Sequence, residues 1–295
     1  MIYRKILLFI SSCLFSFLCT AQKKEVQVVL LAGQSNMAGH GNFDALDEKA
    51  LDRVKKAGIR VKLATREPQK KEPVPLTWYN GGSNKKYNFK KHFGPELFSG
   101  VVLSETYPED DFLLIKTAVG GTSLYGAWNP NWTQEKAKIA ERGAARQSMQ
   151  LYQKHIKNIK SNLAVLESKG IPYKIVGVLW MQGEADTNNE LKATAYQQNL
   201  ENLIAAYRKE FGIEKLPFVI GQINIPPRKF KQGPTLVRKA MEQVVADNKN
   251  VALVKTSTDV SWTDYPKHSD DTHYNTEGQK RLGVAFAKAL CSILK

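Results

Sequence analysis

Residues 26–37 read VQVVLLAGQSNM, an apolar run that ends at a glycine and is followed by a serine. A short apolar run bounded by glycine is typical of a buried strand, so we expect a strand over residues 26–31 and a turn directly after it. Open α/β folds place their chemistry at the carboxyl edge of the sheet, which is where Ser35 would lie. The segment therefore makes Ser35 a candidate nucleophile.

Strand-like and helix-like segments alternate along the rest of the chain. Apolar runs predict further strands at residues 112–118, 175–181, 218–223 and 251–255, with a weaker candidate at 59–64. Apolar residues at three- and four-residue spacing predict helices at about 94–106, 134–168, 188–211, 233–248 and 277–293. Because each strand is nearly all apolar, the pattern indicates an α/β fold with a parallel sheet covered on both faces. Residues 65–93 break the pattern and predict a long surface loop.

The first 21 residues have the pattern of a signal peptide. Arg4 and Lys5 precede an apolar stretch at 6–18, and small residues at 19–21 offer a cleavage site. The apolar stretch is shorter than the roughly 20 residues that a membrane-spanning helix needs, and an uncleaved anchor is the alternative. We expect export to the periplasm or the extracellular space, with residues 22–295 forming a single domain and no membrane span after removal of the signal.

Charge and cysteine content narrow the function classes. The chain has 43 Lys and Arg against 28 Asp and Glu, a formal net charge of +15. The cations are spread along the chain, which is typical of a solvated surface, and export argues against a nucleic-acid partner; weak attraction to acidic polysaccharide is a minor hypothesis. Cys291 is the only cysteine of residues 22–295, so no internal disulfide is expected. The sequence gives no indication of oligomeric state.

A serine nucleophile needs a base within hydrogen-bond reach, and one histidine stands out among the five in the chain. Asp270 precedes His273 by three residues. One turn of backbone can hold that carboxylate against Nδ1 of the imidazole and leave Nε2 free for Ser35. The chain thus carries the parts of an acyl-transfer site near its two ends.

Two other interpretations of these residues have less support in the sequence. The nucleophile segment has Met37 where the G-x-S-x-G elbow of α/β-hydrolases requires glycine, which disfavours that fold. A metal site could use His268, Asp270, Asp271 and His273, but no second cluster of ligands accompanies them.

Two glycine-containing segments follow other predicted strands. Residues 116–123 read KTAVGGTS, and residues 180–186 read WMQGEAD. Paired glycines allow backbone N–H groups to approach a ligand closely. Both segments should emerge at the sheet edge that carries Ser35, where an oxyanion needs hydrogen-bond donors.

Together these segments resemble the SGNH-hydrolase superfamily, in the branch of carbohydrate esterase family six and the sialate O-acetylesterase-like domains. The matching motifs are GQSNM at 33–37, GGT at 120–122, WMQGEAD at 180–186 and D-x-x-H at 270–273. The resemblance implies a three-layer α/β/α sandwich with a mostly parallel sheet of about five strands. It also implies a triad of Ser35, His273 and Asp270, and an oxyanion hole formed by the N–H groups of Ser35 and Gly121 with the side chain of Gln182.

The chain departs from the superfamily in its third motif, where an asparagine donor is usual. Gln182 is the physically sensible donor there, because an ionised Glu184 cannot donate a hydrogen bond. Glu184 either orients the site or is a structural hydrogen-bond partner. Gly120 is the alternative to Gly121 as the backbone donor.

The resemblance implies a serine esterase that removes O-acetyl groups from carbohydrate, with acetylated xylan or sialic acid-type sugars among the open substrates. The mechanism requires neither a metal nor an organic cofactor. Tyr125, Trp128 and Trp132 are candidates for stacking on sugar rings, with capping of the core as the equally weighted alternative. The competing functions are a lipase or thioesterase of the same superfamily, a non-catalytic carbohydrate-binding protein and, last, a nucleic-acid binder.

Overall fold

The computed structural model describes residues 23–259 and 263–294, so the predicted signal peptide lies outside the described residues. At its centre is a seven-stranded sheet in the order β10-β9-β8-β1-β7-β3-β4. All neighbouring strands are parallel except β3 and β4. The strands of this sheet are β1 (Val26–Gly33), β3 (Val61–Ala64), β4 (Val74–Pro75), β7 (Asp111–Ala118), β8 (Tyr173–Met181), β9 (Phe218–Gly221) and β10 (Val251–Val254).

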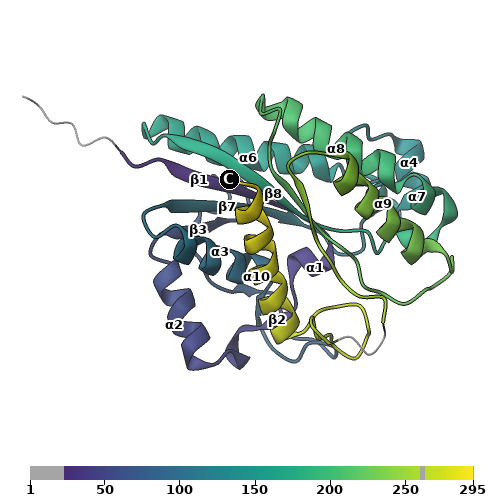
Figure 1. Ribbon diagram of the computed structural model, residues 1–295, viewed down its shortest axis with the longest axis horizontal. Helices are drawn as coiled ribbons and strands as arrows, with labels where there is room; N and C mark the ends of the chain where they lie inside the picture. Colours follow the sequence, from purple (N-terminus) through teal and green to yellow (C-terminus); the bar gives the residue numbers. More distant parts are fainter. Residues whose placement is uncertain (1–22, 260–262, 295) are drawn as a thin grey trace, which may run out of the picture.

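Helices cover both faces of the sheet, which gives the three layers visible in Figure 1. Helices α6, α8 and α9 lie on one face, and α2, α3 and α10 lie on the other. The helices are α1 (Ser35–Ala38), α2 (Glu48–Ala57), α3 (Pro95–Thr106), α4 (Gln134–Ala140), α5 (Ala144–Gln147), α6 (Leu151–Ser168), α7 (Glu190–Thr194), α8 (Tyr196–Phe211), α9 (Gly233–Asp247) and α10 (Thr276–Ile293), with short 3₁₀ turns at Phe43–Ala45 and Asp186–Asn188.

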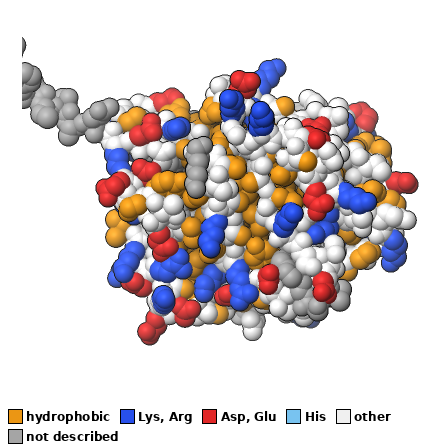
Figure 2. All heavy atoms as spheres, in the orientation of Figure 1, with side chains coloured by type: hydrophobic (Ala, Val, Ile, Leu, Met, Phe, Trp, Pro, Cys, Tyr) orange, Lys and Arg blue, Asp and Glu red, His pale blue; other side chains and the backbone are white. Residues whose placement is uncertain are grey.

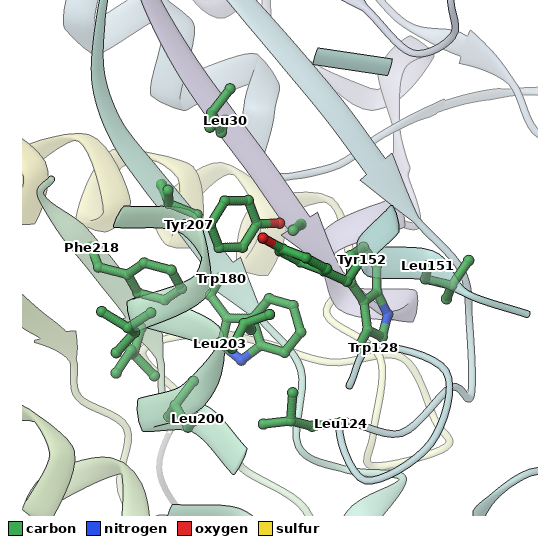
Figure 3. Packing of buried hydrophobic residues seen from close by; sticks show 14 of the residues in the cluster. Leu30, Leu124, Trp128, Leu151, Tyr152, Trp180, Leu200, Leu203, Tyr207 and Phe218 are labelled. Carbon is green, nitrogen blue, oxygen red and sulfur yellow. The ribbon is translucent and has the colours of Figure 1, made fainter. Parts of the chain in front are cut away.

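The central strands are apolar throughout because each of their faces packs against a different core. Val28 and Leu30 of β1 belong to the cluster under α6 and α8, whereas Val29 and Leu31 belong to the cluster under α3 and α10. Successive side chains of a strand point to opposite faces, so burial on both sides removes the usual polar alternation. Figure 3 shows part of the first cluster.

The structure confirms the alternating α/β pattern and corrects three details. The sheet has seven strands rather than about five, because the weaker candidate at 59–64 forms β3 and the expected loop contributes β4, which pairs antiparallel to β3. The long helix expected at 134–168 is three helices, with breaks at 141–143, where Gly143 has a left-handed φ of 78°, and at 148–150. Helix α2 was not expected, although Asp47 caps it by accepting a hydrogen bond from Ala50 N at 2.7 Å.

The expected loop at 65–93 also carries a second, small sheet. Its three strands are β2 (Gly41–Asn42), β5 (Tyr79–Asn80) and β6 (Lys91–Phe93), in the order β2-β6-β5. Both of its pairings are antiparallel. The loop is therefore fastened to the segment that follows α1 rather than lying free on the surface.

Strand order defines one favoured edge for a site. β1 lies between β7 and β8, with Gly33 in register with Ala118 on one side and Met181 on the other. The chain leaves β1 at the position where strand order reverses, which is where open α/β sheets form their crevice. The segments after these three strands therefore converge.

Lys and Arg side chains are distributed over the face in Figure 2 and interspersed with acidic side chains, as expected for a solvated surface. Within residues 23–259 and 263–294, no helix has the length and apolar character needed to cross a bilayer.

Candidate active site

Ser35 is presented by a turn that glycine makes possible. At Gly33 a Cβ atom would lie 2.0 Å from the Met181 carbonyl oxygen, and φ is +153°. The close approach lets Gln34 N donate to that same oxygen at 2.9 Å. Ser35 is the first residue of α1, so its N–H has no partner within the helix. The serine is 7% exposed at the carboxyl edge of the sheet.

The D-x-x-H motif at 270–273 contacts Ser35, although His273 and Ser35 are 238 positions apart in the sequence. His273 Nε2 lies 2.9 Å from Ser35 Oγ, and His273 Nδ1 lies 2.5 Å from Asp270 Oδ2. Asp270 Oδ1 accepts hydrogen bonds from the backbone N–H groups of Thr272 and His273 at 3.0 and 2.9 Å. The structure thus brings together the three residues that the sequence predicts as a triad.

The electrostatics of these groups suit a base and its orienting carboxylate. Burial alone would raise the pKa of Asp270, but hydrogen bonds from Lys86, His273 and backbone N–H groups outweigh it and leave that pKa below its ordinary value. Burial lowers the pKa of His273, and the Asp270 carboxylate opposes this shift. An imidazole that is neutral near pH 7 can accept a proton from a serine.

Asn36 joins the turn that carries Ser35 to the loop that carries Asp270 and His273, here called the histidine loop. Its Nδ2 donates to Glu184 Oε1 at 2.8 Å and to the Thr272 carbonyl oxygen at 3.0 Å. Its Oδ1 accepts from Tyr274 N at 3.2 Å. Burial raises the pKa of Glu184, which favours its neutral form. Glu184 lines the cavity beside Ser35 and is hydrogen-bonded to Asn36, an arrangement that fits an orienting role.

The glycine motif after β7 lies against the serine. A Cβ atom at Gly120 would lie 3.5 Å from Ser35 Cβ. Gly121 has a left-handed φ of +69°, and its carbonyl oxygen accepts a hydrogen bond from Arg146 Nη1 at 3.0 Å. Both glycines line the cavity, so either one can present its backbone there.

Gln182 does not line this cavity. It is fully buried, and its Nε2 lies 2.7 Å from Asp186 Oδ2, 3.0 Å from the Thr122 carbonyl oxygen and 3.2 Å from Gln34 Oε1. An amide group has two hydrogens, and three internal acceptors surround them. Burial raises the pKa of Asp186 to about 6.

Gln34, by contrast, lines the cavity directly before Ser35. Its Oε1 accepts hydrogen bonds from Gln182 Nε2 and from Ala185 N, both at 3.2 Å. Its Nε2 has no hydrogen-bond partner in the described part of the chain. Gln182, which the sequence predicts as the oxyanion donor, thus orients Gln34. The amide nitrogen of Gln34 is free to donate a hydrogen bond.

The cavity beside Ser35 and His273 has a volume of about 520 Å³ and a cationic lining. The cationic side chains of its wall are Arg142, Arg146, Lys192, Arg228 and Lys229. The carboxylates of the wall, Glu141 and Glu184, are 5% and 3% exposed and accept hydrogen bonds from the protein. Sequence reasoning missed these cations, because nothing in their local patterns distinguishes them from surface lysines and arginines.

The three aromatic residues expected to contact sugar do not line this cavity. Trp128 is fully buried, donates from Nε1 to Thr122 Oγ1 at 3.1 Å and packs edge-on against Trp180 at 5.3 Å (Figure 3). It belongs to the core, which was the alternative to sugar stacking. Tyr125 and Trp132 are partly buried, and neither lines the cavity.

The alternative metal site finds no support in the side-chain geometry. His268 Nε2 lies 2.9 Å from the His40 carbonyl oxygen, whereas Asp270 and His273 contact each other. Within the described ranges, no three His, Cys, Asp or Glu side chains are grouped as metal ligands would be.

Known structures share this fold. The crystal structure of an Arabidopsis thaliana protein aligns over 92% of this chain and 100% of its own, with a TM-score of 0.64 and 21% identity. NanS aligns over 92% and 98%, with a TM-score of 0.60 and 14% identity. A carbohydrate acetylesterase from Xanthomonas citri aligns over 91% of this chain and 56% of its own, with a TM-score of 0.57 and 14% identity.

Sequence comparison extends the likeness from fold to family. A probable carbohydrate esterase of Arabidopsis thaliana is 26% identical over 279 residues, which cover 90% of each chain. The family model described as carbohydrate esterase, sialic acid-specific acetylesterase, matches residues 25–292. This match spans all four motifs and nearly the whole described structure. The chain therefore belongs to this family of carbohydrate acetylesterases and is a carboxylic ester hydrolase.

Proposed function

We propose that the protein removes O-acetyl groups from carbohydrate through an acyl-enzyme formed on Ser35. The observation that carries this proposal is the continuous contact from Ser35 Oγ to His273 Nε2 at 2.9 Å and from His273 Nδ1 to Asp270 Oδ2 at 2.5 Å. A serine, an imidazole base and an orienting carboxylate in this order form the arrangement of acyl-transfer enzymes.

The reaction proceeds in two steps. Ser35 Oγ attacks the acetyl carbonyl carbon while His273 Nε2 accepts its proton, and Asp270 stabilises the imidazolium. His273 then donates that proton to the departing sugar oxygen, which leaves an acetyl group on Ser35. In the second step His273 activates a water molecule that attacks the acyl-enzyme and releases acetate.

The developing oxyanion needs donors that face the cavity. The N–H groups of Ser35 and of Gly121, or of neighbouring Gly120, are our candidates on the backbone. For the side-chain donor we favour Gln34 over Gln182, because the amide of Gln182 is surrounded by internal acceptors and that of Gln34 is not. Gln182 then contributes by holding Gln34 in place.

The cavity also favours one class of substrate. Its cationic wall suits a sugar that carries a carboxylate, since arginine pairs with carboxylates in two parallel hydrogen bonds. Sialic acid-type sugars have such a group, and neutral acetylated xylan has none. The apolar side chains of the wall are Ile139, Ala140 and Ala185, which offer little surface to a long acyl chain. The cationic wall and the small apolar surface both argue against the lipase or thioesterase alternative.

Replacement of the nucleophile tests the proposal. Ser35→Ala should lower kcat for a chromogenic acetate ester by at least about a thousandfold while the thermal midpoint stays nearly unchanged. Acetate release from acetylated sialic acid should exceed that from acetylated xylo-oligosaccharides, and octanoate esters should be poor substrates. Activity retained by Ser35→Ala would refute the mechanism, and a preference for octanoate would refute the substrate class.

A further inference from the structure

A lysine from the loop before β6 contacts two members of the triad. Lys86 Nζ forms an ion pair with Asp270 Oδ2 and lies 3.1 Å from His273 Nδ1. That same oxygen is the partner of His273 Nδ1 at 2.5 Å. One carboxylate oxygen therefore faces two donors, and the mechanism described above uses only one of them.

The loop holds Lys86 in this position through ordered contacts. Asn84 Oδ1 accepts hydrogen bonds from the N–H groups of Lys86 and Tyr87, both at 2.9 Å. Tyr87 is 6% exposed and stacks on His40 with ring centroids 4.3 Å apart. The Lys86 ammonium lies 5.2 Å from the centroid of the Tyr87 ring. An anchored neighbour fixes the backbone of Lys86, so the ion pair with Asp270 requires no further ordering of the loop backbone.

We propose that Lys86 is a positioning residue of the triad, whose ammonium group fixes the Asp270 carboxylate and disfavours protonation of His273. The inference rests on the proposed function of these residues. A cation beside the imidazole repels the imidazolium form, so the base remains available at lower pH. The same repulsion acts on the imidazolium of the transition state, so Lys86 extends activity toward acid rather than raising the maximal rate.

Of the other groups around the imidazole, His40 and Tyr87 do not supply this effect, whereas His268 acts in the same direction as Lys86. His40 meets His273 edge-on with centroids 5.0 Å apart, and burial lowers the pKa of His40 to about 3, which leaves it uncharged near neutrality. Tyr87 lies edge-on at 6.5 Å, and burial raises its pKa. Ser35 and His268 are the remaining groups near the His273 ring. The His268 ring, like Lys86, opposes a positive charge on His273.

A second cation acts near the carboxylate instead of the imidazole. Lys267 interacts electrostatically with Asp270, and its Nζ donates to the Asp271 carbonyl oxygen at 3.0 Å. Burial lowers the pKa of Lys267. Burial alone would lower the pKa of Lys86, but the hydrogen bonds and electrostatic attraction to Asp270 and Tyr87 together outweigh it and leave that pKa above its ordinary value. Lys86 is thus a full positive charge at the pH values where His273 titrates.

The test compares Lys86→Met with Lys85→Met, which removes the same charge from an exposed neighbour on the same loop. NMR titration of the His273 ring proton, assigned with His273→Gln, reads the imidazole directly and needs no turnover. The pH profile of kcat/KM for an acetate ester reads the same ionisation in the working enzyme. Lys86→Arg, which keeps the charge, serves as the conservative variant.

In Lys86→Met we expect the His273 titration and the acid limb of kcat/KM to move up by about half to one pH unit. Lys85→Met and Lys86→Arg should leave both in place. An unmoved titration in Lys86→Met, whether or not the plateau of kcat/KM falls, would overturn the proposal, and so would equal shifts in Lys85→Met and Lys86→Met. Failure of the proposed function would appear separately, as acetate release that survives Ser35→Ala.

Discussion

At the scale of single residues, the role of a polar side chain depends on whether its polar atoms line the cavity or are enclosed in the protein. Gln34 and Gln182 carry the same side chain and contact each other at 3.2 Å, yet one amide lines the cavity and the other is enclosed. Glu184 and Asp186 show a similar contrast. Glu184 lines the cavity, whereas Asp186 accepts hydrogen bonds from the N–H groups of Leu124 and Tyr125 in the interior.

Replacing Gln34 by glutamate tests which glutamine donates to the oxyanion. Gln34→Glu keeps an oxygen for the N–H of Ala185 and for Gln182 but replaces the free amide nitrogen by a second oxygen. We expect kcat to fall about a hundredfold or more, as for the loss of one oxyanion donor, with a nearly unchanged thermal midpoint. Gln198→Glu, an exposed replacement of the same kind, is the control. Full kcat in Gln34→Glu would remove Gln34 from the oxyanion hole.

At the scale of elements, the residues of the site lie on the segments that follow the strands, not within long helices or strands. Helix α1 has only four residues and depends on its surroundings. Lys116 of β7 supports it by donating to the Ala38 carbonyl oxygen at 2.9 Å, and this buried ammonium pairs with Glu96 of α3 at 2.6 Å. The turn before α1 is fixed by the contact of Gly33 with the end of β8.

Alanine at Gly33 should therefore disrupt the edge of the sheet that carries Ser35. Its Cβ would lie 2.0 Å from a backbone oxygen, so Gly33→Ala should lower the free energy of unfolding by about 3 kcal/mol or more. Gly212→Ala is the matched control, because Gly212 has a left-handed φ of +64° but open space around its missing Cβ. That variant should lose about 1–2 kcal/mol. Equal losses in urea denaturation would contradict a steric role for Gly33.

At the scale of the whole molecule, the site exists because two chain ends meet on one edge of the sheet. Asn36 makes this junction: its side chain bonds to Thr272 and Tyr274, more than 230 positions away, and to Glu184 after β8. Helix α10, capped by Asn275 at its start, packs against α3 and places the histidine loop beside α1. The distance between Ser35 and His273 thus depends on the packing of the entire sheet.

Removal of the Asn36 side chain should loosen this junction. Asn36→Ala leaves several buried partners unsatisfied, so we expect a loss of about 2–4 kcal/mol in unfolding free energy. We also expect a fall of about tenfold or more in kcat, since His273 would no longer be held at Ser35. Calorimetry and ester hydrolysis measure the two effects, and Asn131→Ala at an exposed position is the control. Unchanged activity and stability would show that the chain ends meet without this tie.

The amino-acid sequence was enough to predict the order and type of most elements and the three residues proposed as the catalytic triad. Strands buried on both faces leave uninterrupted apolar runs, and short motifs after strands 26–31, 112–118 and 175–181 must share one edge if those strands are parallel. Strand β4 escaped prediction because two residues are too short to leave a periodic signal. Helix α2 did leave one, since Ala50, Val54 and Ala57 lie on one face and Asp47 caps the first turn, so its sequence could have predicted it.

Which side chains face the cavity follows only from the three-dimensional packing. The enclosure of Gln182, the burial of Trp128, the contact of Lys86 with Asp270 and the cationic wall all depend on segments that are distant in sequence. Local pattern shows which face of an element is apolar, but it does not specify which other element covers that face. The order of strands and the packing of helices supply that information, because they fix the neighbours of each side chain.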